Sequence, residues 1–174
     1  QILEKNNISE VVITGVNIGD FGRKSNDGNL FNLLKNIDDK STINRFRISS
    51  IEPNLLTEDI IKFINDSNSF LPHFHIPLQS GNDKILKLMK RKYNLKMYRE
   101  KIEMIKKTIP DACIGADVIV GFPGETSEDF ESTFNYINKL NINYLHVFSY
   151  SNRTGTVASE LTNQVPKTEK INRS

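Results

Sequence analysis

Polar side chains and glycines gather where successive apolar runs of this sequence end. The side chains are amides, hydroxyls, carboxylates and one guanidinium. Together with the glycines they are Gly15 and Asn17; Ser50 and Glu52; Gln79 and Ser80; Asp117, Gly121 and Glu125; and Ser149, Tyr150 and Arg153. Carboxylates can bind an amine or sugar hydroxyls, and an arginine or a serine can bind a carboxylate. The set therefore suits a small, polar, zwitterionic ligand, and it contains no nucleophile beside a base.

The segment from Cys113 to Thr126, C-I-G-A-D-V-I-V-G-F-P-G-E-T, is the clearest junction between a strand and a helix. Its apolar run is typical of a strand buried on both faces of a parallel sheet. Gly121 and Gly124 let the backbone turn and approach a ligand closely. Thr126 and Asp129 have the spacing of a capping box for the next helix. The segment predicts either a ligand-binding loop or a plain strand-to-helix turn.

Several other kinds of site are not indicated. The glycine spacing of residues 15–22, G-V-N-I-G-D-F-G, lacks both the dinucleotide fingerprint and the P-loop lysine. His75 and His146 fall inside predicted strands and are interpreted as neutral, hydrogen-bonded core residues, so no metal site is predicted. The single Cys113 excludes an intrachain disulfide framework and an all-cysteine metal site within this chain. It indicates a reducing compartment, and we expect a cytoplasmic protein.

Strand and helix patterns alternate along the chain and would bring these groups together. The repeat of about thirty residues implies right-handed β-α units and a parallel sheet. The expected strands are 11–14, 45–49, 73–78, 113–121 and 144–148, and the expected helices are 29–37, one starting after 57, 82–92, 95–109 and 127–140. The predicted fold class is α/β, a truncated, TIM-barrel-like partial parallel β/α barrel with about five units, because a complete barrel needs about 250 residues. A doubly wound open sheet is the alternative.

Positive charge is concentrated in one helical region. Residues 83–107 hold ten Lys or Arg against three Asp or Glu, although the net charge of the chain is only +2. Both a solvated helix face and a phosphate-binding surface fit this pattern. No apolar run is long enough to span a membrane, so no membrane partner is expected. Residues 1–156 are predicted to form the barrel fragment, and 157–174 a linker or surface helix leading to a further domain.

Five segments carry a family resemblance when taken together. They are G-V-N-I-G-D-F-G, R-I-S-S-I-E-P, H-I-P-L-Q-S-G-N-D-K-I-L-K-L-M-K-R, D-V-I-V-G-F-P-G-E-T and F-S-Y-S-N-R-T-G-T. In this order and at these spacings they resemble the radical S-adenosylmethionine domain of the methylthiotransferases that modify tRNA. The resemblance covers Val11 to Thr156. The first two segments look most like the subgroup that acts on N6-threonylcarbamoyladenosine beside the anticodon.

The resemblance implies an enzyme with S-adenosylmethionine and [4Fe-4S] clusters as cofactors and tRNA as its partner. Such an enzyme would cleave S-adenosylmethionine reductively and insert a methylthio group at an adenine carbon. The family's cluster-binding loop with three cysteines is not in this sequence. The resemblance therefore implies that this fragment is inactive alone, and it leaves the oligomeric state open.

The resemblance also implies cofactor-binding roles for individual residues. Gly15 to Asn17 would meet the methionine amino group, and Gln79 and Ser80 would lie near the ribose or the methionine part. Asp117 and the loop that starts at Gly121 would border the cofactor. Phe148 would contact the adenine, and Arg153 would close the site or bind the cofactor carboxylate.

On the substrate side, Glu52, Lys90 and Arg91 are the candidate residues, with the basic helix steering tRNA. Glu52 has the alternative role of capping the helix that starts at Thr57. Two different functions also fit the residues themselves. One is another β/α-barrel enzyme that binds a phosphorylated small molecule through the backbone of Gly121 to Gly124. The other is a non-catalytic RNA-binding module that uses the basic region alone.

Overall fold

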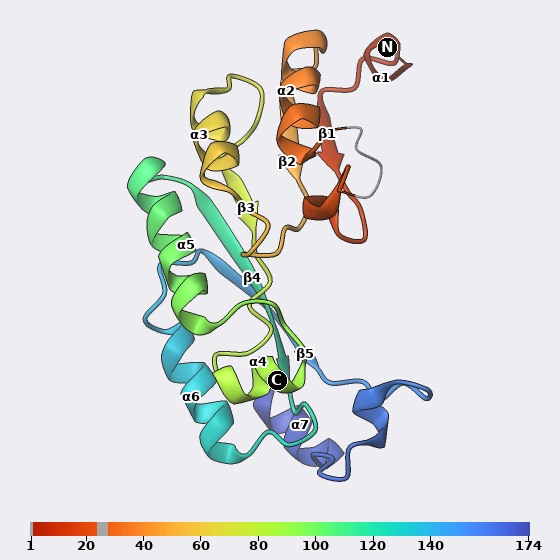
Figure 1. Cartoon of the computed structure of the whole chain (residues 1–174), viewed down its shortest axis with the longest axis vertical. Helices are drawn as coiled ribbons and strands as arrows, with labels where there is room; N and C mark the ends of the chain where they lie inside the picture. The colour runs from red at the N-terminus through yellow and green to blue at the C-terminus, as the bar shows by residue number, and fades with distance from the viewer. Residues whose placement is uncertain (1, 24–27) are drawn as a thin grey trace. The chain divides into compact units, whose positions relative to one another are not determined.

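The computed structural model describes residues 2–23 and 28–174, and Figure 1 shows their elements along the chain. The residues form two compact units. The first runs to Ile76 and includes Glu103–Ile114, and the second consists of Pro77–Ile102 and Gly115–Ser174. Helix α5 (Leu95–Thr108) and strand β4 (Cys113–Val120) contribute residues to both units. Within the described ranges, no helix is both long and apolar enough to cross a bilayer.

The first unit is built around two parallel strands. Its elements are α1 (Ile2–Lys5), β1 (Glu10–Ile13), the 3-10 helix η1 (Ile18–Asp20), α2 (Leu30–Lys40), β2 (Arg45–Ile48), α3 (Glu58–Asp66) and β3 (His73–His75). Strands β1 and β2 are parallel, with Val11 opposite Phe46 and Ile13 opposite Ile48. Phe46 and Phe70 stack at a ring separation of 5.2 Å, and this contact joins β2 to the segment before β3.

The second unit contains the strand pair that matters most for the candidate site. Its elements, besides parts of α5 and β4, are α4 (Asp83–Leu88), α6 (Ser127–Ile137), β5 (Tyr144–Ser149), the 3-10 helix η2 (Val157–Glu160) and α7 (Lys167–Arg173). Strands β4 and β5 are parallel, from Gly115 opposite Tyr144 to Val120 opposite Ser149. A Cβ at Gly115 would lie 1.9 Å from the ring of Tyr144, so the ring occupies the space that a larger residue here would need. Segment 157–174 belongs to this unit, and its connection to a further domain stays a prediction.

Most predicted elements are confirmed, and four helix caps agree with their local sequence. Four of the five predicted strands match the structure to within one residue at each end. The side chains of Asn29, Thr57 and Asn82 accept amide hydrogen bonds at the starts of α2, α3 and α4. Thr126 and Asp129 form the predicted capping box at the start of α6. Caps are predictable because their hydrogen bonds join residues close in sequence.

Four predicted boundaries were wrong. Helix α2 was expected to end at about Ile37 but reaches Lys40, and α6 was expected to reach about Leu140 but ends at Ile137. The third strand was expected to reach Leu78 but ends at His75, because Pro77 has no amide hydrogen for a strand ladder. The basic helix was expected to reach about Lys92 but ends at Leu88. There Lys90 adopts a left-handed φ of 55°. Its amide bonds to Lys87 O and the Arg91 amide to Leu86 O, which is the Schellman way of ending a helix.

The buried face of α6 also differs from the prediction. The helical spacing of its apolar residues predicts that Phe130, Phe134 and Ile137 pack inward, but the buried residues are Asp129, Thr133 and Tyr136, and Phe134 is 58% exposed. The physical reason is that polar backbone groups face this side of the helix. The Thr133 hydroxyl accepts a bond from the Gly81 amide at 3.1 Å, and Tyr136 donates to the Leu95 carbonyl at 2.6 Å. Hydroxyl-bearing side chains satisfy those groups, and phenylalanine cannot.

The stability of the first unit is expected to fall in mild acid through His73. Burial lowers the pKa of His73, and the positive charge of Arg47 acts in the same direction. Folding therefore favours the neutral ring, and stability is lost as the pH falls below the unfolded pKa of about 6.5 and through the lower folded pKa. We expect the melting temperature of the wild type to drop more than that of His73→Gln between about pH 7.5 and about pH 5.5. Equal drops in thermal scans would contradict this.

Candidate functional site

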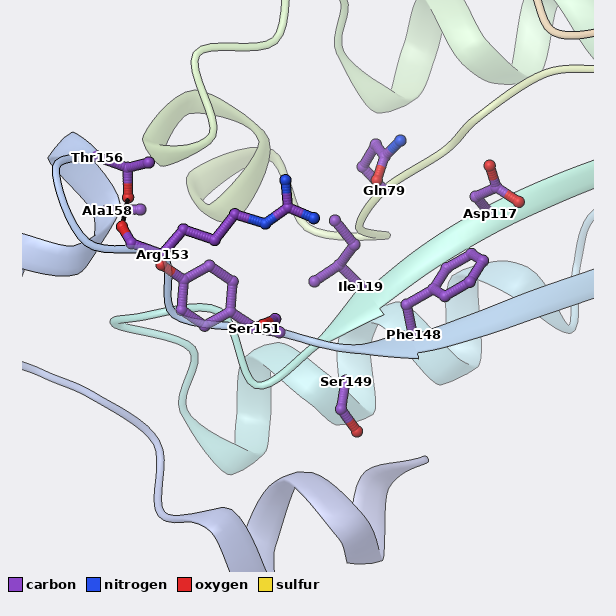
Figure 2. A pocket seen from close by; sticks show the side chains of 10 residues that line it. Gln79, Asp117, Ile119, Phe148, Ser149, Ser151, Arg153, Thr156 and Ala158 are labelled. Carbon is purple, nitrogen blue, oxygen red and sulfur yellow. Dashed lines mark hydrogen bonds between the residues drawn. The ribbon is translucent and has the colours of Figure 1, made fainter.

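A cavity of about 560 Å³ opens at the carboxyl ends of β4 and β5 in the second unit. Three segments build it: the turn at residue 79, the C-terminal half of β4, and the chain from the end of β5 to η2. In Figure 2 the side chains of Gln79, Ile119, Phe148 and Arg153 lie on one side of the strands, and Ser149 points away from them. The lining residues are Gln79, Asp117, Ile119, Phe148, Ser149, Tyr150, Ser151, Arg153, Thr156 and Ala158. The cavity therefore unites four of the predicted cofactor-binding residues: Gln79, Asp117, Phe148 and Arg153.

Gln79 is held rigidly at the wall of this cavity. Its amide donates to Asp117 O at 2.8 Å, and its carbonyl accepts from the Ile119 amide at 2.9 Å. Its φ of 68° lies in the left-handed region, which is rare for a residue other than glycine, asparagine or aspartate. The side-chain oxygen Oε1 is buried and has no hydrogen-bond partner among the described residues. A buried acceptor of this kind calls for a donor, and a ligand amine or hydroxyl supplies one.

Asp117 lies beside His146 at the same wall. The two side chains approach to 3.2 Å between Asp117 Oδ1 and His146 Nδ1. The interpretation of His146 as a core residue was wrong, since its side chain is 56% exposed. Residues of β5 alternate between two faces, so His146 and Phe148 lie on one face, with their ring centres 6.4 Å apart. Phe148 is 51% exposed and offers an open aromatic surface.

Arg153 and Tyr150 come from the segment that follows β5. The Arg153 side chain extends toward Ile119 and Gln79, so its guanidinium reaches the cavity (Figure 2). Tyr150 packs edge-on against Phe122 at 5.2 Å. Its hydroxyl is buried and lacks a hydrogen-bond partner among the described residues. The cavity thus combines a cation, an aromatic face and two unsatisfied buried polar atoms.

The Gly121–Glu125 turn does not line this cavity. Gly121 and Gly124 have positive φ values of 72° and 87°, which explains both glycines as turn formers. The Glu125 carboxylate is satisfied inside the unit: Oε1 accepts from the Gly121 amide at 2.8 Å and from Arg173 Nη1 at 2.6 Å. We infer that this turn shapes the unit. Direct binding of a cofactor by Gly121 stays a prediction.

Ser80 likewise points into the protein interior. It is fully buried, its hydroxyl lies 3.3 Å from the Thr133 hydroxyl, and it accepts the Asn82 amide at 3.2 Å. These bonds join the turn after Gln79 to α6. Ser80 is absent from the cavity lining, so we infer that it supports the position of Gln79.

Three further predicted residues belong to the first unit. Gly15 and Asn17 line a cavity of about 500 Å³ with neighbours between Thr14 and Arg23. Glu52 is half-buried, and its carbonyl accepts amide bonds from Leu55 and Leu56. The cap of α3 is Thr57, whose side chain accepts the Ile60 amide at 3.3 Å.

Lys90 and Arg91 line another cavity of the second unit, with a volume of about 850 Å³. Lys84 and Lys87 of α4 join them, and Ile119, Tyr150 and Ala158 border both this cavity and the one at Gln79. Lys87 was not among the predicted site residues. The helical spacing of Lys84, Lys87 and Arg91 was the available signal, because residues three and four apart share a face.

The Asp129 carboxylate links the N-terminal ends of α4 and α6 through hydrogen bonds. Its carboxylate accepts from Asn82 Nδ2 at 3.0 Å, Lys84 Nζ at 2.6 Å and the Thr126 amide at 3.0 Å. Burial acts to raise the pKa of Asp129, but the bonds from Lys84 and Thr126 prevail and hold it below its usual value.

Replacing Asp129 with alanine is expected to lower the free energy of unfolding by about 2 kcal/mol, because a cap and two further hydrogen bonds are lost. Urea denaturation measures this, with the exposed Glu131→Ala on the same helix as the control. Equal losses in the two variants would contradict the role given to Asp129.

Comparison with known proteins places the chain in a family. The radical SAM superfamily model matches residues 1–137. The chain belongs to the radical SAM superfamily. Two solved radical SAM enzymes share its fold. Coproporphyrinogen III oxidase (HemN) from Escherichia coli aligns with a TM-score of 0.68 and 18% identity, over 95% of this chain and 38% of that one. The methyltransferase TsrM from Kitasatospora setae aligns with a TM-score of 0.66 and 14% identity, over 85% of this chain and 29% of that one. The predicted α/β class, a truncated parallel β/α barrel, is thereby confirmed.

This radical SAM chain is also similar to curated tRNA-modifying enzymes. It is 40% identical over 168 residues to the threonylcarbamoyladenosine tRNA methylthiotransferase MtaB of Bacillus subtilis, which covers 94% of this chain and 37% of that protein. It is 36% identical to the tRNA-2-methylthio-N(6)-dimethylallyladenosine synthase of Acetivibrio thermocellus, covering 99% of this chain and 36% of that protein. The chain thus spans little more than a third of the length of these relatives.

The two cofactors of radical SAM enzymes fit this chain differently. A [4Fe-4S] cluster is held by cysteine thiolates, whereas the chain has the single, half-buried Cys113. Its residues therefore do not fit the cluster. S-adenosylmethionine carries an adenine ring, ribose hydroxyls, an amine and a carboxylate. The cavity at Gln79 offers an aromatic surface, a buried acceptor and a guanidinium for these groups.

Proposed function

We propose that this chain is part of a tRNA methylthiotransferase and that its cavity at Gln79 binds S-adenosylmethionine. One observation carries the proposal. In a radical SAM chain, Gln79, Phe148 and Arg153 line a single cavity whose chemistry matches the parts of that cofactor. The similarity to methylthiotransferases over nearly the whole chain supports the reaction class.

Each wall residue has a distinct task in this proposal. Phe148 and Ile119 pack against the adenine ring and exclude water from it. The Arg153 guanidinium binds the methionine carboxylate, and Gln79 Oε1 accepts a hydrogen bond from the amine or a ribose hydroxyl. Asp117 borders the ligand and orients His146 through the contact at 3.2 Å. When bound, S-adenosylmethionine would supply the radical chemistry, and the residues of this chain would position it and shelter it from water.

The identity of the modified nucleoside is inferred from sequence similarity. We propose N6-threonylcarbamoyladenosine of tRNA as the modified nucleoside, since MtaB of Bacillus subtilis has the higher identity of the two relatives compared above. Because the chain holds a single cysteine, we also propose that it is inactive without a cluster-binding segment. Mass analysis of tRNA nucleosides tests both points. The full-length protein, reconstituted with iron and sulfide, should add a methylthio group to that nucleoside, and the fragment should add none.

Calorimetric titration tests the ligand assignment against its rival. We expect S-adenosylmethionine to bind with measurable heat and ribose 5-phosphate to give none. The reverse result would favour a barrel enzyme that binds a phosphorylated small molecule through its glycine turn. That rival is disfavoured by the Gly121 amide, which donates to Glu125 at 2.8 Å and is not open to a phosphate.

A further inference from the structure

The second cavity, lined by Lys84, Lys87, Lys90 and Arg91, combines positive charge with an apolar floor. Leu88, Met89, Phe122, Val157 and Leu161 are among its apolar lining residues. Among the described residues, no aspartate or glutamate lines it. Lys84 pairs with Asp129 at 2.6 Å, and Lys87, Lys90 and Arg91 are the other basic residues of the lining. A ligand that fits such a cavity carries both negative charge and a flat or bulky apolar part.

The end of α4 fixes the backbone of Lys90 and Arg91. The Schellman bonds from Lys90 to Lys87 and from Arg91 to Leu86 are each 3.0 Å long. They hold Lys90 in a left-handed conformation that glycine would adopt at lower cost. A lysine kept at a glycine position indicates that its side chain serves a purpose beyond ending the helix.

Tyr150 provides an independent sign of a ligand in this place. It lines both cavities, and its hydroxyl is buried without a hydrogen-bond partner among the described residues. Ile119 and Ala158 are also shared by the two cavities. An occupant of the second cavity therefore lies directly beside an occupant of the first.

We propose that the second cavity binds one nucleotide of the substrate RNA, adjacent in sequence to the nucleotide that is modified. Its base lies on the apolar floor by Leu88 and Phe122, the Tyr150 hydroxyl bonds to its polar edge, and its phosphate is bound by Lys87, Lys90 and Arg91. Unstacked bases on apolar or aromatic side chains, with phosphates on cations, are the usual mode of binding single-stranded RNA. The proposal rests on the proposed function, because the shared wall places this nucleotide next to the cofactor.

RNA binding by the full-length protein tests the subsite. Fluorescence anisotropy with a labelled anticodon stem-loop measures the dissociation constant and its salt dependence. Lys87→Ala and Arg91→Ala should each weaken binding about tenfold, as expected for a lost hydrogen bond to a charged group. Each should also lower the slope of log affinity against log salt by about one.

Lys90→Gly is the sharpest variant, because it removes the charge while glycine suits the left-handed backbone, so the fold is retained. Tyr150→Phe, which deletes only the hydroxyl, should weaken RNA binding about threefold to tenfold. The exposed Lys139→Ala is the matched control for loss of one charge, and it should leave affinity unchanged.

The outcomes separate this inference from the proposed function. If the wild type binds the stem-loop and all cavity variants bind it as Lys139→Ala does, the subsite is wrong and the proposed function stands. If the wild type does not bind the stem-loop, both are overturned. The variants at Lys87, Lys90 and Arg91 should also keep the wild-type affinity for S-adenosylmethionine. A loss of that affinity would assign these cations to the cofactor and contradict the subsite.

Discussion

Arg173→Ala is expected to lower the free energy of unfolding by about 3 kcal/mol or more, because it leaves the buried Glu125 carboxylate without its cation. Arg173 Nη1 lies 2.6 Å from Glu125 Oε1, and the two side chains are only 6% and 2% exposed. Arg173 also donates to Glu169 at 3.0 Å and lies over the Phe130 ring at 5.4 Å. Removing one partner of a buried pair costs far more than breaking an exposed one.

Urea denaturation with matched variants tests this expectation. Lys62→Ala breaks the exposed pair with Glu58 and is expected to change stability by less than about 0.5 kcal/mol. Glu125→Gln keeps the shape of the side chain but removes its charge, and it should also destabilise because the buried Arg173 then keeps only the more exposed Glu169 as a counter-ion. An Arg173→Ala protein as stable as Lys62→Ala would show that α7 does not hold the Gly121–Glu125 turn.

Arg153→Ala is expected to weaken S-adenosylmethionine binding about 30-fold, or ~2 kcal/mol, because a charged hydrogen bond to the methionine carboxylate is lost. A second ligand, methylthioadenosine, tests the contact between Arg153 and the carboxylate more specifically. Methylthioadenosine has the adenine and ribose but no carboxylate, so its affinity should be the same for the wild type and for Arg153→Ala. Phe148→Ala, in contrast, should weaken both ligands, because both stack adenine on that ring.

Calorimetry with both ligands measures these effects. Asn152→Ala, at the exposed neighbouring position, is the control and should behave as the wild type does. Arg153→Lys should restore only part of the affinity, because lysine cannot bind a carboxylate through two parallel bonds. An equal loss for both ligands in Arg153→Ala would mean that Arg153 shapes the cavity and does not bind the carboxylate.

Features of the fold that depend on bonds between residues close in sequence were predicted correctly. The capping box of Thr126 and Asp129 and the extent of β4 follow from residues close in sequence, and the structure confirms them. The convergence of Gln79, Asp117 and Arg153 was also predictable, because the carboxyl ends of parallel strands meet at one edge of a sheet.

Properties set by distant partners were not predictable. The role of Glu125 depends on Arg173, which lies 48 residues later in a segment interpreted as a linker or surface helix. The inward face of α6 depends on the polar backbone at Gly81, so the spacing of its apolar residues predicted the wrong buried face. His146 sits in an apolar strand pattern, yet the outer half of β5 is exposed.

A crystal structure of the protein grown with S-adenosylmethionine tests the central claim most directly. We expect adenine density against Phe148 and Ile119, and the methionine carboxylate within hydrogen-bond distance of the Arg153 guanidinium. Well-defined cofactor density that leaves Gln79, Phe148 and Arg153 without contact would contradict it.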